Sequence, residues 1–173
     1  MKEIEVKILE IDKEKIIKKL ESFGAKKIFD DDIISYFFDF PDNALEKKQM
    51  LFRLRSKGTS GELTLKKKIS KEKAKINEET EVSVSDIVVM KKIIEALGMK
   101  TKYNHTKHRV SYLLGNVRFE IDTFKEIPTF LEIEADSIKT LHIWAVKLGF
   151  SKKDLKPWSE RDLMQHYGKE KFK

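Results

Sequence analysis

The sequence predicts an α+β protein in which eight antiparallel strands close into a β-barrel with helices packed on the outside. Roughly eight short segments alternate apolar and charged residues and are mostly separated by turns, a pattern typical of an antiparallel sheet that can close. Three segments of helical period could cover the outside of that curved sheet. Charged pairs at positions i and i+2 recur on nearly every strand, so we expect the charged faces to converge inside the barrel.

The first strand, at residues 1–8, shows this alternation most clearly. Successive side chains of a strand point to opposite faces, so every second residue shares a face. The charged face holds Glu3, Glu5 and Lys7, and the apolar face holds Ile4, Val6 and Ile8. Taken alone, this pattern also fits a half-exposed strand, and its repetition along the chain is what favours a charged interior.

The remaining elements follow from the same two periodicities. Strands are predicted at residues 33–40, 51–57, 62–69, 76–84, 100–114, from 117 onward and at 130–135, with a hairpin turn at 58–61. Helices are predicted at residues 12–23, 86–97 and 137–148, each followed by a glycine typical of a helix C-terminus, and a short amphipathic segment lies in the tail. No linker interrupts the pattern, so residues 1–173 are predicted to form a single domain.

Composition narrows the class of ligand and the location of the protein. Charged residues make up 38% of the 173 residues, and the net charge of +7 suits an anionic ligand. There are no cysteines, which excludes disulfides and thiolate chemistry. No apolar run approaches the ~18 residues of a membrane-spanning helix, and the chain opens without a signal peptide. We therefore expect a soluble, cytoplasmic protein, either a monomer or a homodimer.

The inward faces would bring acids and bases together in a narrow lumen. The acids are Glu3, Glu5, Glu79, Glu81, Glu120, Asp122, Glu132 and Glu134, and the bases are Lys7, Arg53, Arg55, Lys66, Lys68, Lys107, Arg109 and Arg118. Confined charges are costly unless they are paired or ligated. A divalent cation such as Mg²⁺ or Mn²⁺ suits the carboxylates, and a polyphosphate suits the lysines and arginines. The alternative is an open sheet with a solvated charged face whose ions pair across strands.

Six charged motifs follow one another in a fixed order. They are Glu3-Ile4-Glu5-Val6-Lys7, Arg53-Leu54-Arg55, Thr64-Leu65-Lys66, Lys107-His108-Arg109, Glu120-Ile121-Asp122 and Glu132-Ile133-Glu134. The ordered set resembles the motifs of the CYTH, or triphosphate tunnel metalloenzyme, family, whose members include class IV adenylyl cyclases, thiamine triphosphatases and inorganic or RNA triphosphatases. The resemblance runs from Lys2 to about Leu163.

The resemblance implies a closed, eight-stranded tunnel that binds a triphosphate with Mg²⁺ or Mn²⁺. The residues implied on the metal side are Glu3, Glu5, Asp122, Glu132 and Glu134. Those implied to hold phosphate are Lys7, Arg53, Arg55, Lys66, Lys107 and Arg109, to which we add Lys68 from the same strand face. The candidate catalytic residues are Lys7, Glu81 and Glu120, the last two as carboxylates that could position a water molecule.

Chain length and helix placement resemble the small class IV cyclases, which convert ATP to cyclic AMP and pyrophosphate. Hydrolysis of inorganic, thiamine or nucleoside triphosphate stays open, because the grip on a triphosphate is common to both reactions. A non-catalytic binder of nucleotide or polyphosphate is a rival of another class. The lysine-rich residues 66–75 have no interleaved aromatic side chains, so we do not expect nucleic acid as a partner.

Overall fold

The computed structural model describes residues 2–58 and 60–169. Met1 of the predicted first strand, Thr59 of the predicted turn and the last four residues of the predicted domain lie outside the described residues. Among those described, no helix is both long enough and apolar enough to span a membrane.

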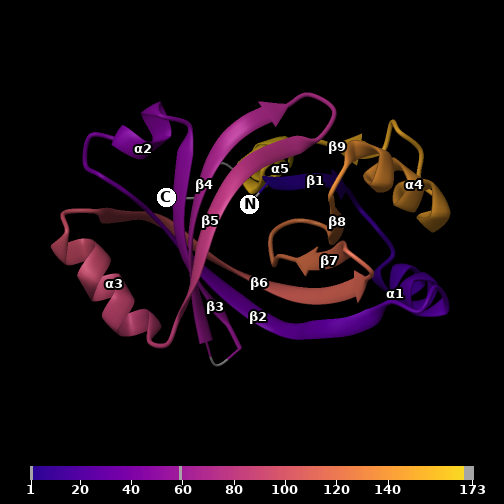
Figure 1. Cartoon of the computed structure of the whole chain (residues 1–173), viewed down its shortest axis with the longest axis horizontal. Coiled ribbons are helices and arrows are strands. Elements are labelled where there is room, and N and C mark those ends of the chain that lie inside the picture. The colour runs from indigo at the N-terminus through magenta and orange to yellow at the C-terminus, as the bar shows by residue number, and fades with distance from the viewer. Residues whose placement is uncertain (1, 59, 170–173) are drawn as a thin grey trace.

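An antiparallel sheet of nine strands forms the body of the described chain and closes into a barrel (Figure 1). The strands are β1 (Lys2–Ile8), β2 (Lys26–Asp39), β3 (Met50–Lys57), β4 (Ser60–Lys71), β5 (Lys75–Val84), β6 (Lys100–Leu114), β7 (Val117–Thr123), β8 (Phe130–Ala135) and β9 (Leu155–Lys156). Their order is β5-β4-β3-β2-β6-β7-β8-β1-β9, and pairing of β1 with β5 closes the first eight strands into a ring. The predicted closed barrel of eight strands is therefore confirmed.

The strands differ from the prediction at one long element and one short one. Strand β2 begins at Lys26, well before the predicted start at residue 33, and pairs with β6 over nearly its whole length. The run Asp30-Asp31-Asp32 breaks the apolar alternation there, so only the pairing with β6 reveals the strand. Strand β9 has two residues, too few to show a periodicity.

In the part of the chain that the structure describes, five helices lie outside the barrel (Figure 1). They are α1 (Lys13–Ser22), α2 (Ala44–Lys47), α3 (Ile87–Ala96), α4 (Ile138–Leu148) and α5 (Glu160–His166). Capping side chains fix where the long helices begin, because each accepts a hydrogen bond from a backbone N–H of the first turn. Asp12 accepts from Lys15 N at 3.0 Å, and Asp86 accepts from Val89 N at 2.9 Å. The one-turn α2 was not predicted.

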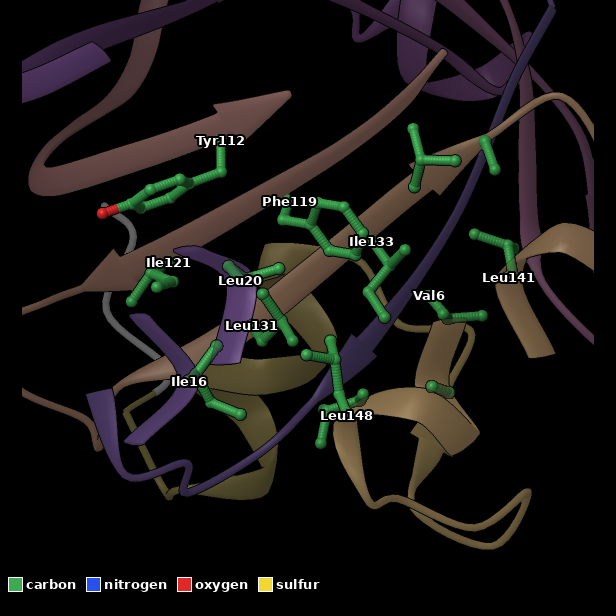
Figure 2. Close-up of a cluster of buried hydrophobic side chains, with 14 of the residues drawn as sticks. Val6, Ile16, Leu20, Tyr112, Phe119, Ile121, Leu131, Ile133, Leu141 and Leu148 are labelled. Carbon is green, nitrogen blue, oxygen red and sulfur yellow. The ribbon is translucent and has the colours of Figure 1, made fainter. Parts of the chain in front are cut away.

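The main hydrophobic core lies between the outer face of the barrel and helices α1 and α4 (Figure 2). Leu20 of α1 and Leu141 of α4 are fully buried against Leu131 and Ile133 of β8. Burying a leucine or isoleucine side chain contributes roughly 1.5–3 kcal/mol, so this layer stabilises the barrel substantially. Val6 joins the same cluster, which turns the apolar face of β1 outward and its charged face inward.

A second core packs α3 against the opposite flank of the barrel. Ile94 of α3 is buried with Leu54 and Phe38, while Gly61 of β4 lies under the start of the helix. A Cβ atom at Gly61 would come within 2.6 Å of Ile87 Cγ1, so a side chain there would push α3 outward. Because helices cover the apolar faces on both flanks, the charged faces of the strands are left to line the interior.

Candidate active site

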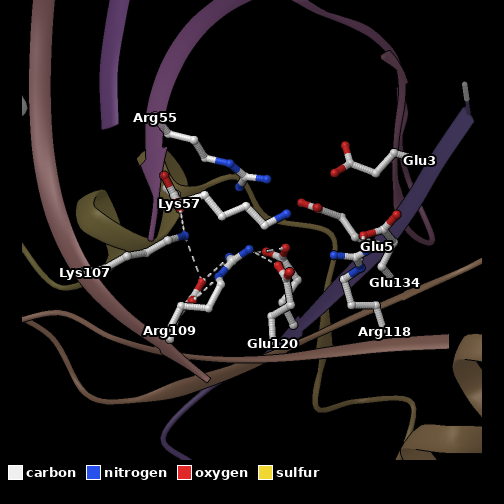
Figure 3. A network of polar contacts seen from close by, with 12 residues as sticks. Glu3, Glu5, Arg55, Lys57, Lys107, Arg109, Arg118, Glu120 and Glu134 are labelled. Carbon is white, nitrogen blue, oxygen red and sulfur yellow. Dashed lines mark hydrogen bonds and ion pairs between the residues drawn. The ribbon is translucent and has the colours of Figure 1, made fainter. Parts of the chain in front are cut away.

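A cavity of about 1260 Å³ runs through the interior of the barrel. Ordinary ligand pockets measure roughly 300–1,000 Å³, so this one has room for an extended, charged molecule. Predicted site residues on seven different strands line it: Glu3, Glu5, Lys7, Arg53, Arg55, Lys66, Glu81, Lys107, Arg109, Glu120, Glu132 and Glu134. Figure 3 shows Arg55, Lys107 and Arg109 reaching into the same space as Glu3, Glu5 and Glu134 on the other wall.

Lys7 lies at the centre of this network and is only 1% exposed. Its Nζ donates to Glu5 Oε1 at 2.9 Å and also bonds Glu132 Oε2. Burial alone would lower the pKa of Lys7, but the neighbouring carboxylates of Glu132 and Glu5 outweigh it and raise the pKa above its usual value. Lys7 is therefore a permanently charged ammonium group in the wall of the cavity.

Glu3 is paired in a similar way one step along β1. Lys66 Nζ donates to Glu3 Oε1 at 2.6 Å, and Asn77 Nδ2 donates to Oε2 at 2.9 Å. Burial alone would raise the pKa of Glu3, but the charges of Lys66 and Lys75 and these hydrogen bonds lower the pKa to about 2. Glu3 is thus ionised, with its charge already balanced by lysines.

Asp122 is buried behind the wall of the cavity. Arg109 donates two hydrogen bonds of 2.6 Å to its carboxylate, from Nε and from Nη2. Lys107 Nζ donates a third, of 2.9 Å. Asp122 is 0% exposed and does not line the cavity. These bonds fix Arg109 and Lys107 in place, and the metal-side role of Asp122 stays a prediction.

An arginine pair on β3 forms the basic wall opposite β1. Arg53 and Arg55 both form ion pairs with Glu62 of β4, at 3.6 Å for Arg53. Lys57 Nζ lies 3.4 Å from the same carboxylate. The Nε atoms of both arginines are buried and have no hydrogen-bond partner among the described residues. Such buried donors lack the acceptor that folded proteins almost always supply, so this wall is suited to an anion.

The facing wall has the opposite imbalance. Glu134 on β8 lies among Glu3, Glu120 and Glu132, and its nearest cation is Arg118, with Nε 4.0 Å from Oε2. Burial and these three carboxylates raise the pKa of Glu134 to about 7. Burial also raises the pKa of Glu120 despite the ion pair with Arg109. The site therefore has excess negative charge at this wall.

The acidic residues are chemically suited to a hard divalent cation. Their ligand atoms are all carboxylate oxygens, which Mg²⁺ and Mn²⁺ prefer, and a cation beside Glu134 would relieve the repulsion that raises its pKa. As the side chains stand, no three potential ligands within residues 2–58 and 60–169 are gathered closely enough to hold an ion. Lysines and arginines occupy several of these oxygens, so a metal would have to displace them.

Lys68 does not join the cavity that it was predicted to line. Its side chain is exposed on β4, and the register of β4 against β5 shifts between Lys68 and Ser70. The shift falls after Lys68, which still pairs with the inward-facing Asn77, so Lys68 shares the face of Lys66 but is exposed outside the cavity. The functional roles of the other predicted residues stay predictions.

Several cavity residues were not predicted. Glu62 and Lys75 lie on the inward faces of β4 and β5, and extending the i, i+2 pattern from Thr64 and Asn77 would have found both. Glu160 had no such signal, because it stands at the start of α5. Its carboxylate pairs with Lys107 and lies 3.3 Å from His105 Nε2, and Lys107 and His105 help to lower its pKa well below the usual value although burial opposes this.

The fold and the cavity together define a class of protein: a closed antiparallel tunnel with basic and acidic walls. A family model described as "CYTH domain" matches residues 1–154. The chain belongs to the CYTH domain family, as the order of its charged motifs predicted.

Proteins from archaea, bacteria and plants are similar to the chain. It is 29% identical over 137 residues to "Putative adenylate cyclase MJ0240" of Methanocaldococcus jannaschii, covering 78% of this chain and 77% of the relative. The structure of the PH1012 protein from Pyrococcus horikoshii matches with a TM-score of 0.79 and 27% identity, covering 93% and 98% of the two chains. A plant protein from Hippeastrum, HpAC1, described as a putative adenylyl cyclase with a dominant triphosphatase activity, shares the fold at a TM-score of 0.67 and 12% identity, covering 96% of each chain.

Proposed function

We propose that the protein is a metal-dependent enzyme that binds a triphosphate inside the tunnel and cleaves it with the help of Mg²⁺ or Mn²⁺. The observation that carries this proposal is the pair of buried Nε donors of Arg53 and Arg55, which lack acceptors and face a wall of carboxylates. Guanidinium groups match phosphate oxygens in geometry and charge, so a chain of phosphates supplies the missing acceptors.

The chain's own residues would bind and orient the substrate. Arg53 and Arg55 would hold one end of the phosphate chain, and Lys66 and Lys107 would contact it along the tunnel as point charges. Lys7, fixed by Glu5 and Glu132, would stabilise charge that develops on the leaving phosphate oxygens without having to move. Fixed donors of this kind account for much of the catalysis of phosphoryl transfer.

The residues on the metal side would be Glu3, Glu5, Glu132 and Glu134, with Asp122 behind them. When bound, Mg²⁺ or Mn²⁺ supplies charge neutralisation between the substrate phosphates and this acidic wall. The carboxyl group of Glu134, with its pKa of about 7, is half protonated near neutrality and would lose its proton as a cation enters.

The nucleophile decides the product, and the cyclase reaction is the first candidate. The ribose 3′-hydroxyl of ATP would attack the α-phosphorus, pyrophosphate would leave, and a carboxylate would take the hydroxyl proton. The relative from M. jannaschii, named as a putative adenylate cyclase, supports this choice. Glu120 suits the role of proton acceptor, because burial raises its pKa toward neutrality.

Hydrolysis is the second candidate, and Glu81 favours it. Its carboxyl group lies beside the arginine pair, accepts a hydrogen bond of 3.3 Å from Thr64 Oγ1 and has a raised pKa, caused by burial and by Glu62. It could orient a water molecule toward a terminal phosphate and accept its proton. The triphosphatase activity described for HpAC1 belongs to a protein that shares only the fold, and it supports the same reading.

One assay separates these reactions. The protein is incubated with ATP or inorganic triphosphate and Mn²⁺, and cyclic AMP, pyrophosphate and inorganic phosphate are measured together. Cyclic AMP and pyrophosphate in equal amounts are expected for the cyclase, and phosphate without cyclic AMP would establish the triphosphatase. Tight binding without turnover of either substrate would leave a non-catalytic binder and would contradict the proposal.

A further inference from the structure

Glu62 is an acid on the basic wall, where a carboxylate would repel the proposed substrate. It lies directly opposite Arg55 in the pairing of β3 with β4, and its side chain is only 8% exposed. Arg53, Arg55 and Lys57 all form ion pairs with this one carboxylate. Three cations from one strand therefore converge on a single inward-facing anion.

The contacts of Glu62 leave one edge of each guanidinium group available. Glu62 Oε1 faces the terminal nitrogen Nη2 of Arg55 and the terminal nitrogen Nη2 of Arg53. The Nε atoms of the two arginines are the ones left without an acceptor. The arginines are thus held from one side, while their Nε–H donors have no partner among the described residues.

Without this carboxylate the two arginines would repel each other. Both side chains are only 11–12% exposed, so water screens their charges poorly. Thr64 offers Arg53 one weak neutral contact, at 3.3 Å. Glu62 is therefore the carboxylate that forms ion pairs with both arginines and can keep both guanidinium planes in one orientation.

We infer that Glu62 is a positioning residue, which orients Arg53 and Arg55 so that their free N–H donors meet the phosphate chain. This inference rests on the proposed function, because it takes a triphosphate as the ligand. A pre-oriented arginine pair loses less freedom when the ligand binds, so affinity increases although the carboxylate adds a negative charge. Orientation and charge thus predict opposite effects of removing Glu62.

The test is binding of inorganic triphosphate, measured by calorimetry without metal ions. Glu62→Gln removes a charge that repels the ligand, so charge alone would tighten binding. If Glu62 orients the arginines, binding weakens by about tenfold, the loss typical of a charge-assisted contact. The matched control is Glu78→Gln on the adjacent strand β5, which removes an exposed carboxylate outside the cavity and should leave the affinity unchanged.

A double-mutant cycle with Arg55→Ala shows whether the effect passes through the arginine. In the Arg55→Ala background, Glu62→Gln should weaken triphosphate binding less than threefold, because only Arg53 is left to be oriented. Equal losses of affinity in both backgrounds, or unchanged or tighter binding by Glu62→Gln, would overturn the inference.

If Glu62→Gln does not fold, Glu62→Asp serves instead. It keeps the charge but holds it one methylene further from the arginines. Affinity equal to that of the unaltered protein would overturn the inference. Absence of triphosphate binding by the unaltered protein would overturn the proposed function as well.

Discussion

Lys7 shows how much of this site depends on single side chains. A lysine that is 1% exposed is stable as a cation only because Glu5 and Glu132 contact its ammonium group. The three groups form one unit, since removing any of them leaves a buried charge without its partner. Side chains fixed in this way need little rearrangement when a substrate arrives.

Replacing Lys7 with methionine should therefore destabilise the protein. Lys7→Met keeps the volume of the side chain but leaves Glu5 and Glu132 unpaired, and breaking a buried ion pair costs about 3–5 kcal/mol. Urea unfolding should show this loss. In the double variant Lys7→Met/Glu132→Gln the loss should be smaller, and equal losses in the two variants would contradict the pairing.

The raised pKa of Glu134 predicts how the stability of the folded protein depends on pH. Its pKa of about 7 in the folded protein exceeds the ordinary value of 4.5, so the folded state binds more protons than the unfolded state between these values. The metal-free protein should therefore lose stability as pH rises from about 4.5 to 7, with no further loss from this group above that.

Glu134→Gln should remove this loss. Because the Glu134 side chain is 36% exposed, screening reduces the effect to about 1 kcal/mol, or roughly 2–4 °C in melting temperature at pH 8. Melting curves of the metal-free protein at pH 5 and pH 8 test it, with the exposed Glu126→Gln as the control. A Glu134→Gln variant no more stable than the parent at pH 8 would contradict the raised pKa.

At the scale of elements, α5 connects the tail of the chain to the cavity. Ser159 and Asp162 form a capping box at its start, Leu163 packs into a small apolar cluster, and Glu160 extends inward to Lys107. A residue expected to bind phosphate thus also holds the helix. A substrate that contacts Lys107 would therefore also change the contact that holds α5 against the barrel.

Glu160→Gln should loosen this helix. Loss of a charge-assisted bond to Lys107 and of the charge beside His105 costs about 1.5–3 kcal/mol, so amide hydrogen exchange in residues 160–166 should become roughly tenfold faster or more. Arg161→Gln is the matched control on the same helix, because it breaks only the exposed pair with Glu46. Similar exchange in both variants would show that Glu160 does not hold α5.

What the sequence could reveal depended on how local each signal is. The i, i+2 alternation on β1 and β8 shows which face is charged, and the apolar helices show that the other face is covered, so the barrel could be predicted. Residues such as Glu160 could not be, because their approach to the cavity depends on how a tail helix docks. Asp122 and Lys107 were placed in separate metal and phosphate sets, and only the distances show that they bond each other.

The local pattern also failed at two places in the sheet. Lys68 follows the same alternation as Lys66 on β4, but the cavity includes Lys66 and ends before Lys68, which no alternation can show. Similarly, the acidic run at Asp30–Asp32 hides the first half of β2, although β6 pairs with it residue by residue. The first half of β2 can be recognised only from its pairing with β6, which the sequence of one strand does not contain.

At the scale of the whole molecule, the closed sheet couples ligand binding to the stability of the folded state. Strands from all parts of the barrel contribute to the same cavity, so a triphosphate would bridge β1, β3, β4 and β6 at once. A ligand that binds only the folded state stabilises it by about 2.7 kcal/mol at a hundred times its dissociation constant.

Inorganic triphosphate with Mg²⁺ should therefore raise the melting temperature by about 5–10 °C. Because the contact is between charges at the entrance and within the tunnel, the rise should shrink between 0.05 and 0.5 M salt, roughly in step with the shorter screening length. Arg53→Ala should show a smaller rise than the parent at every salt concentration. A rise that does not depend on salt or on Arg53 would place the ligand elsewhere.

The closure of the ring by β1 also has a consequence for biosynthesis. This strand is made before the other strands of the ring, yet the two strands that close the ring against it, β5 and β8, are encoded far downstream. Glu3, Glu5 and Lys7 stay exposed to water until Phe130–Ala135 has been translated, because only then can both edges of β1 pair with other strands. The ring is therefore completed only after β8 has been made, and a truncated product ending before β8 should be left with an open seam, exposed to proteases and prone to self-association.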